Sequence, residues 1–200
     1  MLERSKMADL VVNCDISQIT DPAVIKEVFN NHAARIREIN LRGLTSWFLY
    51  PILESICKSS KSLRLRSLQL RRAFSTEKGN PYFPVNVLVQ PSVLQRLEIW
   101  HCEFDWYTES HPLLTHLVVE KVFDRPLLSE FATILSEMPA LETLEMVDSL
   151  PLAPRAMKSG LKVALSRLSS LRLSSTENFL VCSTFLSFPA QLGSVLLVLK

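Results

Sequence analysis

Glycine, net charge and long apolar runs are all scarce in this chain. Only 4 of the 200 residues are glycine, and tight hairpin turns usually need more, so an all-β protein built from hairpins is not expected. The formal net charge is +2, too small to indicate nucleic-acid or membrane binding through charge alone. The apolar run near the C-terminus spans only 195–199, whereas a membrane helix needs roughly 20 residues.

The first ten residues are charged and lack the apolar stretch of a secretory signal. We therefore expect an intracellular protein, cytoplasmic or nuclear. Cys14, Cys57, Cys102 and Cys182 lie far apart. In a chain without a secretory signal such cysteines indicate buried thiols rather than disulfides. Histidines do gather around Cys102, but without recognised ligand spacing, so neither a metal nor another cofactor is expected.

Sequence motifs of common enzymes are also missing. The chain holds no phosphate-binding loop, no G-x-G-x-x-G, no G-x-S-x-G and no H-E-x-x-H. We therefore expect that this protein is not an enzyme. Its 48% hydrophobic and 21% charged residues are still sufficient for a folded core, and 200 residues suit a single domain over 1–200.

One hexamer, apolar-x-x-apolar-x-apolar, recurs six times. The copies begin 20 to 29 residues apart, at Ile36, Leu65, Leu94, Leu114, Leu141 and Leu168. The third continues as Leu94-x-x-Leu97-x-Ile99-x-x-Cys102, which follows the leucine-rich-repeat consensus, and the intervals match that repeat too. The alternative is chance alternation of leucine in ordinary amphipathic strands.

The hexamers predict strands, and the segments between them predict their return elements. Strands are expected near 10–16, 36–41, 65–70, 94–99, 114–119, 141–146 and 168–173. Helical spacing of apolar residues predicts helices over 21–33, 45–60, 127–138 and 179–186, while 97–114 is short and should return as a loop or a 3₁₀ turn. The expected fold class is α/β: a ribonuclease-inhibitor-like leucine-rich-repeat solenoid with a parallel concave sheet and outer helices.

Three segments carry a resemblance to a known family: 32–44, 94–102 and 135–146. In the last, a helix ends in Met138-Pro139 and Leu141-Glu-Thr-Leu-Glu follows. The chain resembles the repeat region of fungal F-box/leucine-rich-repeat proteins. That resemblance implies repeats that hold a protein for ubiquitination, while an F-box binds the adaptor subunit of a cullin-type ubiquitin ligase.

The F-box itself is not found, because no Leu-Pro-x-Glu stretch is present. Adaptor binding is therefore expected only if an F-box lies upstream. The alternative is a stand-alone or truncated leucine-rich-repeat protein without a role in ubiquitination.

Alternate residues of each hexamer should point outward, because side chains alternate along a strand. One outward column is expected to run Arg42, Arg71, Trp100, Glu120, Val147, Ser174. Within this face, Arg42, Arg71, Arg96 and Trp100 are predicted to form a patch for an acidic or phosphorylated peptide. The alternative is an ordinary solvated sheet face. The predicted protein-binding residues are Arg42, Arg71, Arg96, Glu98, Trp100, His116, Glu120, Glu145 and Arg172.

A second alternative function rests on the basic run over 58–78, which holds seven lysines and arginines: Lys58, Lys61, Arg64, Arg66, Arg71, Arg72 and Lys78. Such a run could contact nucleic acid. Leucines of the repeat interrupt it, however, and a solvated face explains it equally well.

Overall fold

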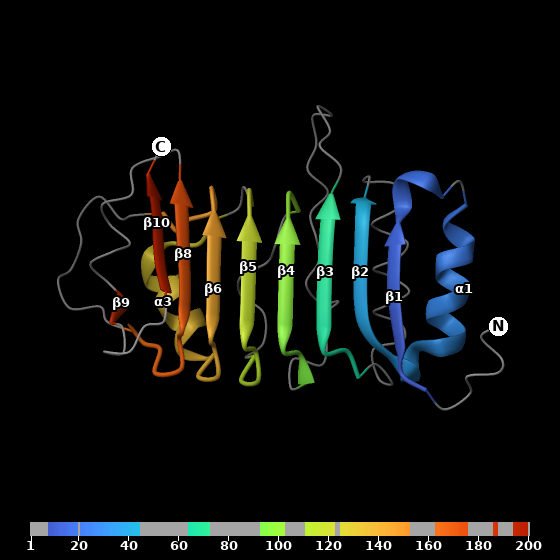
Figure 1. Ribbon diagram of the computed structural model, residues 1–200, viewed down its shortest axis with the longest axis horizontal. Coiled ribbons are helices and arrows are strands. Elements are labelled where there is room, and N and C mark those ends of the chain that lie inside the picture. Colours follow the sequence, from blue (N-terminus) through green and yellow to red (C-terminus); the bar gives the residue numbers. More distant parts are fainter. Residues whose placement is uncertain are drawn as a thin grey trace.

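The computed structural model describes residues 8–19, 21–44, 64–72, 93–102, 111–122, 125–152, 163–175, 186–187 and 194–199. It is an α/β protein whose main feature is a parallel sheet (Figure 1). The strands of that sheet are β1 (Leu10–Asp15), β2 (Ile36–Leu44), β3 (Ser67–Arg72), β4 (Arg96–Trp100), β5 (His116–Glu120), β6 (Thr143–Val147), β8 (Ser170–Ser175) and β10 (Ser194–Leu199).

Strand order in the sheet follows the order of the chain, β1-β2-β3-β4-β5-β6-β8-β10, and every neighbouring pair is parallel. Two short strands, β7 (Val163–Ala164) and β9 (Leu186–Ser187), form a separate parallel pair. The expected helix over 179–186 is wrong at its last residue, because Leu186 belongs to β9. Residues 179–185 lie outside the described part of the chain.

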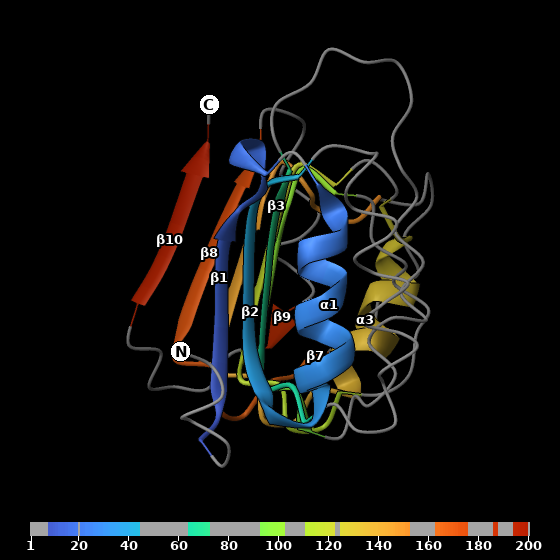
Figure 2. The same ribbon diagram turned by 90° about the vertical axis from the view of Figure 1, so that its right-hand side faces the viewer.

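Both described α-helices, α1 (Pro22–His32) and α3 (Leu128–Ser136), lie on the same side of the main sheet (Figure 2). The Asp21 carboxylate caps α1 by accepting the Ala23 N–H at 2.8 Å, and Pro22 fits the first turn because its fixed φ suits a helix start. Glu130 accepts the Leu127 N–H at 2.7 Å in the first turn of α3. Both helices were predicted from the sequence; the one expected over 45–60 falls outside the described residues.

The short 3₁₀ turns η2 (Ile16–Gln18) and η3 (Ala33–Arg35) lie at the ends of β1 and α1. On the helix side of the sheet, the apolar hexamer residues make one continuous core. Leu68, Leu97, Leu117, Leu144 and Leu171 lie in register across β3 to β8, and each is at most 1% exposed. Each strand therefore relies on its neighbours to cover its leucines, and no strand could bury them alone.

Five strands, β3, β4, β5, β6 and β8, begin two residues later than the hexamers predicted. The leading leucines, such as Leu65 and Leu94, are buried but precede the strand. The backbone explains this. The carbonyl of the next residue accepts two consecutive N–H groups from the neighbouring strand, as Arg66 does from Gln95 and Arg96 at 2.8 and 2.9 Å, and regular pairing starts only after it.

This doubled hydrogen bond recurs at the N-terminal ends of successive strands. Gln95 accepts from Thr115 and His116, Thr115 from Glu142 and Thr143, and Glu142 from Ser169 and Ser170, at 2.8 to 3.0 Å. The side-chain hydroxyls of Thr115 and Ser169 add donors to the carbonyls of Gln95 and Glu142. The same backbone geometry thus accompanies successive hexamers.

The C-terminal ends of three strands share a different feature. His101, Lys121 and Asp148 each follow a strand directly and have φ of 56°, 52° and 49°. Left-handed backbone is uncommon for residues other than glycine. Here it turns the chain inward, so that the next residues, Cys102, Val122 and Ser149, are buried. The three N–H groups donate to carbonyls at the end of the neighbouring strand in the sheet: Glu120 and Val147, the last residues of β5 and β6, and Ser174, the last residue but one of β8.

Strand β2 contains a bulge near its end. Its pairing with β3 passes from Leu41 opposite Leu70 to Leu44 opposite Arg72, so Arg42 and Gly43 together face Arg71. Gly43 has a φ of +70°, and a Cβ there would lie 2.7 Å from Asp15 Oδ1. The expected column therefore has two residues of β2, Arg42 and Gly43, opposite Arg71, because the bulge shifts the register.

Candidate functional site

The side of the sheet opposite α1 and α3 carries the alternate side chains of the strands, and no described helix covers it (Figure 2). We call it the open face. Strand register arranges its residues into rows, of which one runs Gln69, Glu98, Val118, Glu145, Arg172 and another Arg71, Trp100, Glu120, Val147, Ser174. Beyond the bulge of β2, the predicted outward residues thus occupy this face as expected.

Their exposure differs more than simple alternation suggests. Arg42, Arg71, Arg96 and Arg172 are exposed, while Trp100, His116, Glu120 and Glu145 are half-buried. Glu98 is only 5% exposed. A buried carboxylate needs a partner, and Glu98 has one.

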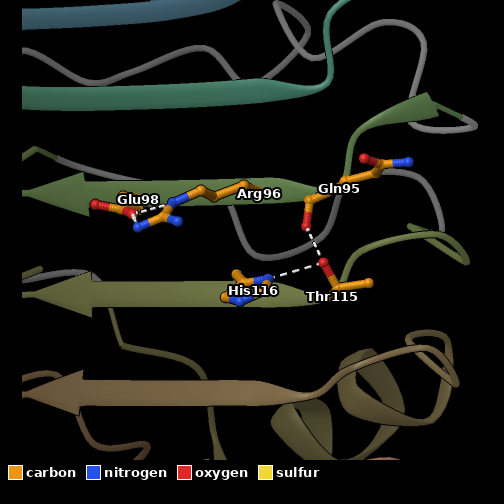
Figure 3. A network of polar contacts seen from close by, with 5 residues as sticks. All are labelled: Gln95, Arg96, Glu98, Thr115 and His116. Carbon is orange, nitrogen blue, oxygen red and sulfur yellow. Dashed lines mark hydrogen bonds and ion pairs between the residues drawn. The ribbon is translucent and has the colours of Figure 1, made fainter.

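That partner is Arg96, on the same strand (Figure 3). Its Nε and one terminal nitrogen both contact Glu98 Oε1. Because Arg96 lies level with Ser67 and His116, it belongs to a different row from Trp100. The structure therefore does not bring Arg96 into the predicted patch with Arg71 and Trp100.

Close to Arg96, the Thr115 hydroxyl links two strands (Figure 3). It donates to the Gln95 carbonyl at 2.9 Å and lies 2.8 Å from His116 Nδ1. The hydroxyl has one proton, and it uses that proton in the hydrogen bond to the Gln95 carbonyl. In the contact with His116 the hydroxyl oxygen is therefore the acceptor, and Nδ1 of His116 carries the donated proton. His116 is thereby oriented by its neighbour and fixed on the open face.

Glu145 and Arg172 form the other carboxylate–guanidinium pair on this face. Arg172 donates to Glu145 Oε1 at 2.6 Å, across β6 and β8. Both side chains remain partly exposed, so the pair adds little to the free energy of folding. Its effect on the surface is to neutralise two charges at the β8 side of the face.

Arg71 and Trp100 occupy paired positions on β3 and β4. The guanidinium carbon of Arg71 lies 4.5 Å from the centre of the Trp100 ring, a cation–π contact. Within the described part of the chain Arg71 makes no ion pair. The ring therefore holds one face of the guanidinium and leaves its N–H groups available to a ligand.

Two residues that the sequence did not assign to the open face, His101 and Lys121, adjoin this pair. His101 Nε2 lies 3.8 Å from Glu120 Oε1, which is next to Trp100 across the sheet. Burial lowers the pKa of His101, and the positive charges of Lys121, Arg71 and Arg72 lower it further, whereas Glu120 opposes them. We call Arg71, Trp100, His101, Glu120 and Lys121 the Arg71 cluster.

The signal for His101 and Lys121 was present but easily missed. Strand alternation ends at Trp100, and the consensus leaves two positions between Ile99 and Cys102. The left-handed φ of the second position brings its side chain beside the end of the open face, rather than into the core. A prediction from strand alternation therefore includes Trp100 but not the residue after it.

Arg42 contributes to a different neighbourhood. It lies opposite Asp15 of β1, where hydrogen bonds from Ser17, with a smaller contribution from the positive charge of Arg42, lower the pKa of the Asp15 carboxyl. Arg42 therefore has the Asp15 carboxylate as a neighbouring opposite charge, and it shares its position opposite Arg71 with Gly43. Among the four residues of the predicted patch, the contact that the structure shows is the one between Arg71 and Trp100.

The basic run over 58–78 is described only between 64 and 72. There Arg64, Arg66 and Arg71 are exposed, Arg72 is buried, and Leu65, Leu68 and Leu70 belong to the core. The charges thus follow strand alternation rather than forming one basic surface. Lys58, Lys61 and Lys78 lie outside the described residues.

In the part of the chain that the structure describes, no three His, Cys, Asp or Glu side chains gather as metal ligands would. Nor is any described helix long and apolar enough to cross a membrane. Cys14 is half-buried and Cys102 buried, both as free thiols, while Cys57 and Cys182 fall in undescribed segments. Comparison with protein-family models, with curated proteins and with solved structures finds no match to this chain.

Proposed function

We propose that this chain is a leucine-rich-repeat solenoid that binds another protein through the open face of its sheet. The observation that carries the proposal is the combination of a parallel sheet in chain order with polar, register-matched rows on a face that no described helix covers. An ordinary doubly wound α/β protein has helices on both faces. A one-sided arrangement leaves several strands free to contact one extended partner.

Recurrent backbone geometry supports the repeat assignment. The doubled hydrogen bonds lie at the N-terminal ends of the strands and the left-handed residues at their C-terminal ends. Each of the two features occurs at the same position relative to the hexamer in successive strands. Cys102, Val122 and Ser149 occupy the buried N/C position of the leucine-rich-repeat consensus. A chance alternation of leucine would not require matched turns at both ends.

We further propose that the bound protein is a ubiquitination substrate, and that the chain is the substrate-recognition part of an F-box-type ligase receptor. The support is the sequence resemblance of 32–44, 94–102 and 135–146 to the fungal F-box/leucine-rich-repeat family. The structure is compatible with it, since Met138 and Pro139 follow the end of α3 and precede β6. A stand-alone repeat scaffold is the competing proposal.

Site-specific photo-crosslinking tests the binding face. A photoreactive phenylalanine derivative is placed at Gln69 or Val118, half-buried positions on the open face, and, as a matched control, at exposed Ser129 of α3 on the helix side. Crosslinking is done in cells and the partner is identified by mass spectrometry. We expect one shared partner from Gln69 and Val118 and none from Ser129. Crosslinks from Ser129 that equal those from the open face would reject the proposal.

The ligase role needs a separate test. The transcript is read upstream of Met1 in the same frame, and the protein it encodes is purified from cells with its bound subunits. An F-box segment together with a cullin adaptor supports the receptor proposal. Absence of both favours the stand-alone scaffold, whichever face the partner uses.

A further inference from the structure

We infer that the Arg71 cluster binds an aspartate or glutamate side chain of an acidic peptide segment in the partner protein. The inference rests on the proposed function, since it names the chemistry of the segment that the open face recognises. It departs from the sequence-based patch by replacing Arg42 and Arg96 with His101 and Lys121, which the structure places beside Arg71 and Trp100.

The first support is the state of the charges on the open face. Two other arginines of the open face on these strands contact a carboxylate: Arg96 contacts Glu98, and Arg172 contacts Glu145. Arg71 instead contacts an aromatic ring. It therefore keeps hydrogen-bond donors that a carboxylate from another molecule can use, whereas the other two arginines are already satisfied.

The second support is preorganisation. An exposed arginine loses side-chain freedom when it binds a ligand, and a group held in advance loses less. Trp100, held on β4, supports the guanidinium at 4.5 Å. An arginine fixed in this way can present two parallel N–H groups to one carboxylate, which is the strongest geometry for such a pair.

The third support is the balance of charge around Arg71. Lys121 adds a second positive charge and Glu120 adds a negative one, while burial and the surrounding cations favour the neutral form of His101. The five residues of the cluster therefore carry a net charge of one positive unit at neutral pH, and the charge of the buried Arg72 also acts on His101, so the cluster attracts an anionic side chain. A phosphoryl group, with about −1.5 to −2 charges, would bring more negative charge beside Glu120 than a carboxylate does, and the phosphoserine peptide tests this difference.

The test uses fluorescence anisotropy with three labelled dodecapeptides. The first alternates glutamate and serine, the second has glutamine in place of every glutamate, and the third has glutamine at all of these positions and one phosphoserine. Each is titrated with the parent chain, with Arg71→Gln, and with Arg172→Gln. Arg172 is the matched control, because it is also an exposed arginine of the open face but is already paired with Glu145.

We expect the glutamate peptide to bind at least about tenfold more tightly than the glutamine peptide, since hydrogen bonds between charged groups are roughly twice as strong as those between neutral groups. Arg71→Gln should remove most of that difference and Arg172→Gln little of it. Trp100→Leu should weaken binding by a smaller factor, because Arg71 remains but is no longer held. Unchanged circular dichroism in each variant shows that the fold is intact.

Three results would overturn the inference. They are equal binding of the glutamate and glutamine peptides, equal losses in Arg71→Gln and Arg172→Gln, and preferred binding of the phosphoserine peptide. None of them alters the crosslinking result at Gln69 and Val118. Failure of the acidic-peptide inference and failure of the open-face proposal are therefore distinguishable.

Discussion

The Ser149 hydroxyl accepts the backbone N–H of Val122 at 3.0 Å, although the two residues lie 27 positions apart in the chain. The same hydroxyl donates to the Val147 carbonyl at 3.0 Å. Val122 follows the left-handed turn after β5, where its N–H is removed from water and the regular sheet has ended. Ser149 thus connects the segments that follow β5 and β6, where strand pairing no longer does so.

Replacing Ser149 with alanine should destabilise the protein by about 1–3 kcal/mol, because it leaves a buried N–H without its acceptor. The measurement is the free energy of unfolding from urea denaturation. Ser174→Ala is the matched control, since Ser174 is a half-buried strand serine whose hydroxyl makes no hydrogen bond in the described structure. Equal stability of Ser149→Ala and Ser174→Ala would contradict this role for Ser149.

Gly43→Ala should destabilise the protein by more than about 1 kcal/mol. Left-handed backbone is unfavourable for alanine by roughly 1–2 kcal/mol, and the added Cβ would also press against Asp15 Oδ1 and Ser17. Asn40→Ala, on the same strand but without positive φ, should change stability much less. A midpoint of thermal unfolding that does not move in Gly43→Ala would show that the bulge is not required.

His101 should make the fold less stable as the solution becomes acidic. Burial, together with Lys121, Arg71 and Arg72, lowers its pKa in the folded state from the usual 6.5, despite the opposing Glu120. The unfolded chain therefore binds the extra proton first. The stabilisation is fully present above pH 6.5 and is lost as the pH falls through the lower, folded-state pKa.

His101→Gln removes this titration, so its free energy of unfolding should fall less than that of the parent chain as the pH is lowered below 6.5. Urea denaturation at several pH values measures the difference. Parallel pH profiles for the two proteins would contradict the prediction. Asp15, whose pKa is also lowered, acts in a separate window below its usual 3.8, where its loss of charge removes stability.

Much of the fold could be predicted because it depends on periodicity. The hexamers identified the buried leucines and the outward residues, since these follow from strand alternation within each hexamer, and the regular recurrence of the hexamers predicted the parallel sheet. The strand starts could not be predicted to the residue, because they depend on which carbonyl accepts two N–H groups. Nor was β10 predicted, since the apolar segment over 194–199 lacks the full hexamer.

The site could be predicted only in part, because side-chain partners depend on the neighbouring strand. Register alone put Arg71 beside Trp100. It could not reveal that Arg96 turns toward Glu98 of its own strand, nor that a bulge in β2 places both Arg42 and Gly43 opposite Arg71. His101 and Lys121 were missed because their positions depend on left-handed turns, and nothing in those two residue types favours such a turn.

The ladder of doubled hydrogen bonds joins Gln95 to Thr115 across 20 residues and Glu142 to Ser169 across 27, with the same geometry at each step. The spacing of neighbouring strands therefore does not depend on the number of residues that connect them. Insertions and deletions between the hexamers can accumulate without displacing one open-face residue relative to the next. Homologous chains should consequently vary in length between the hexamers, while the order of outward side chains is altered only by substitution.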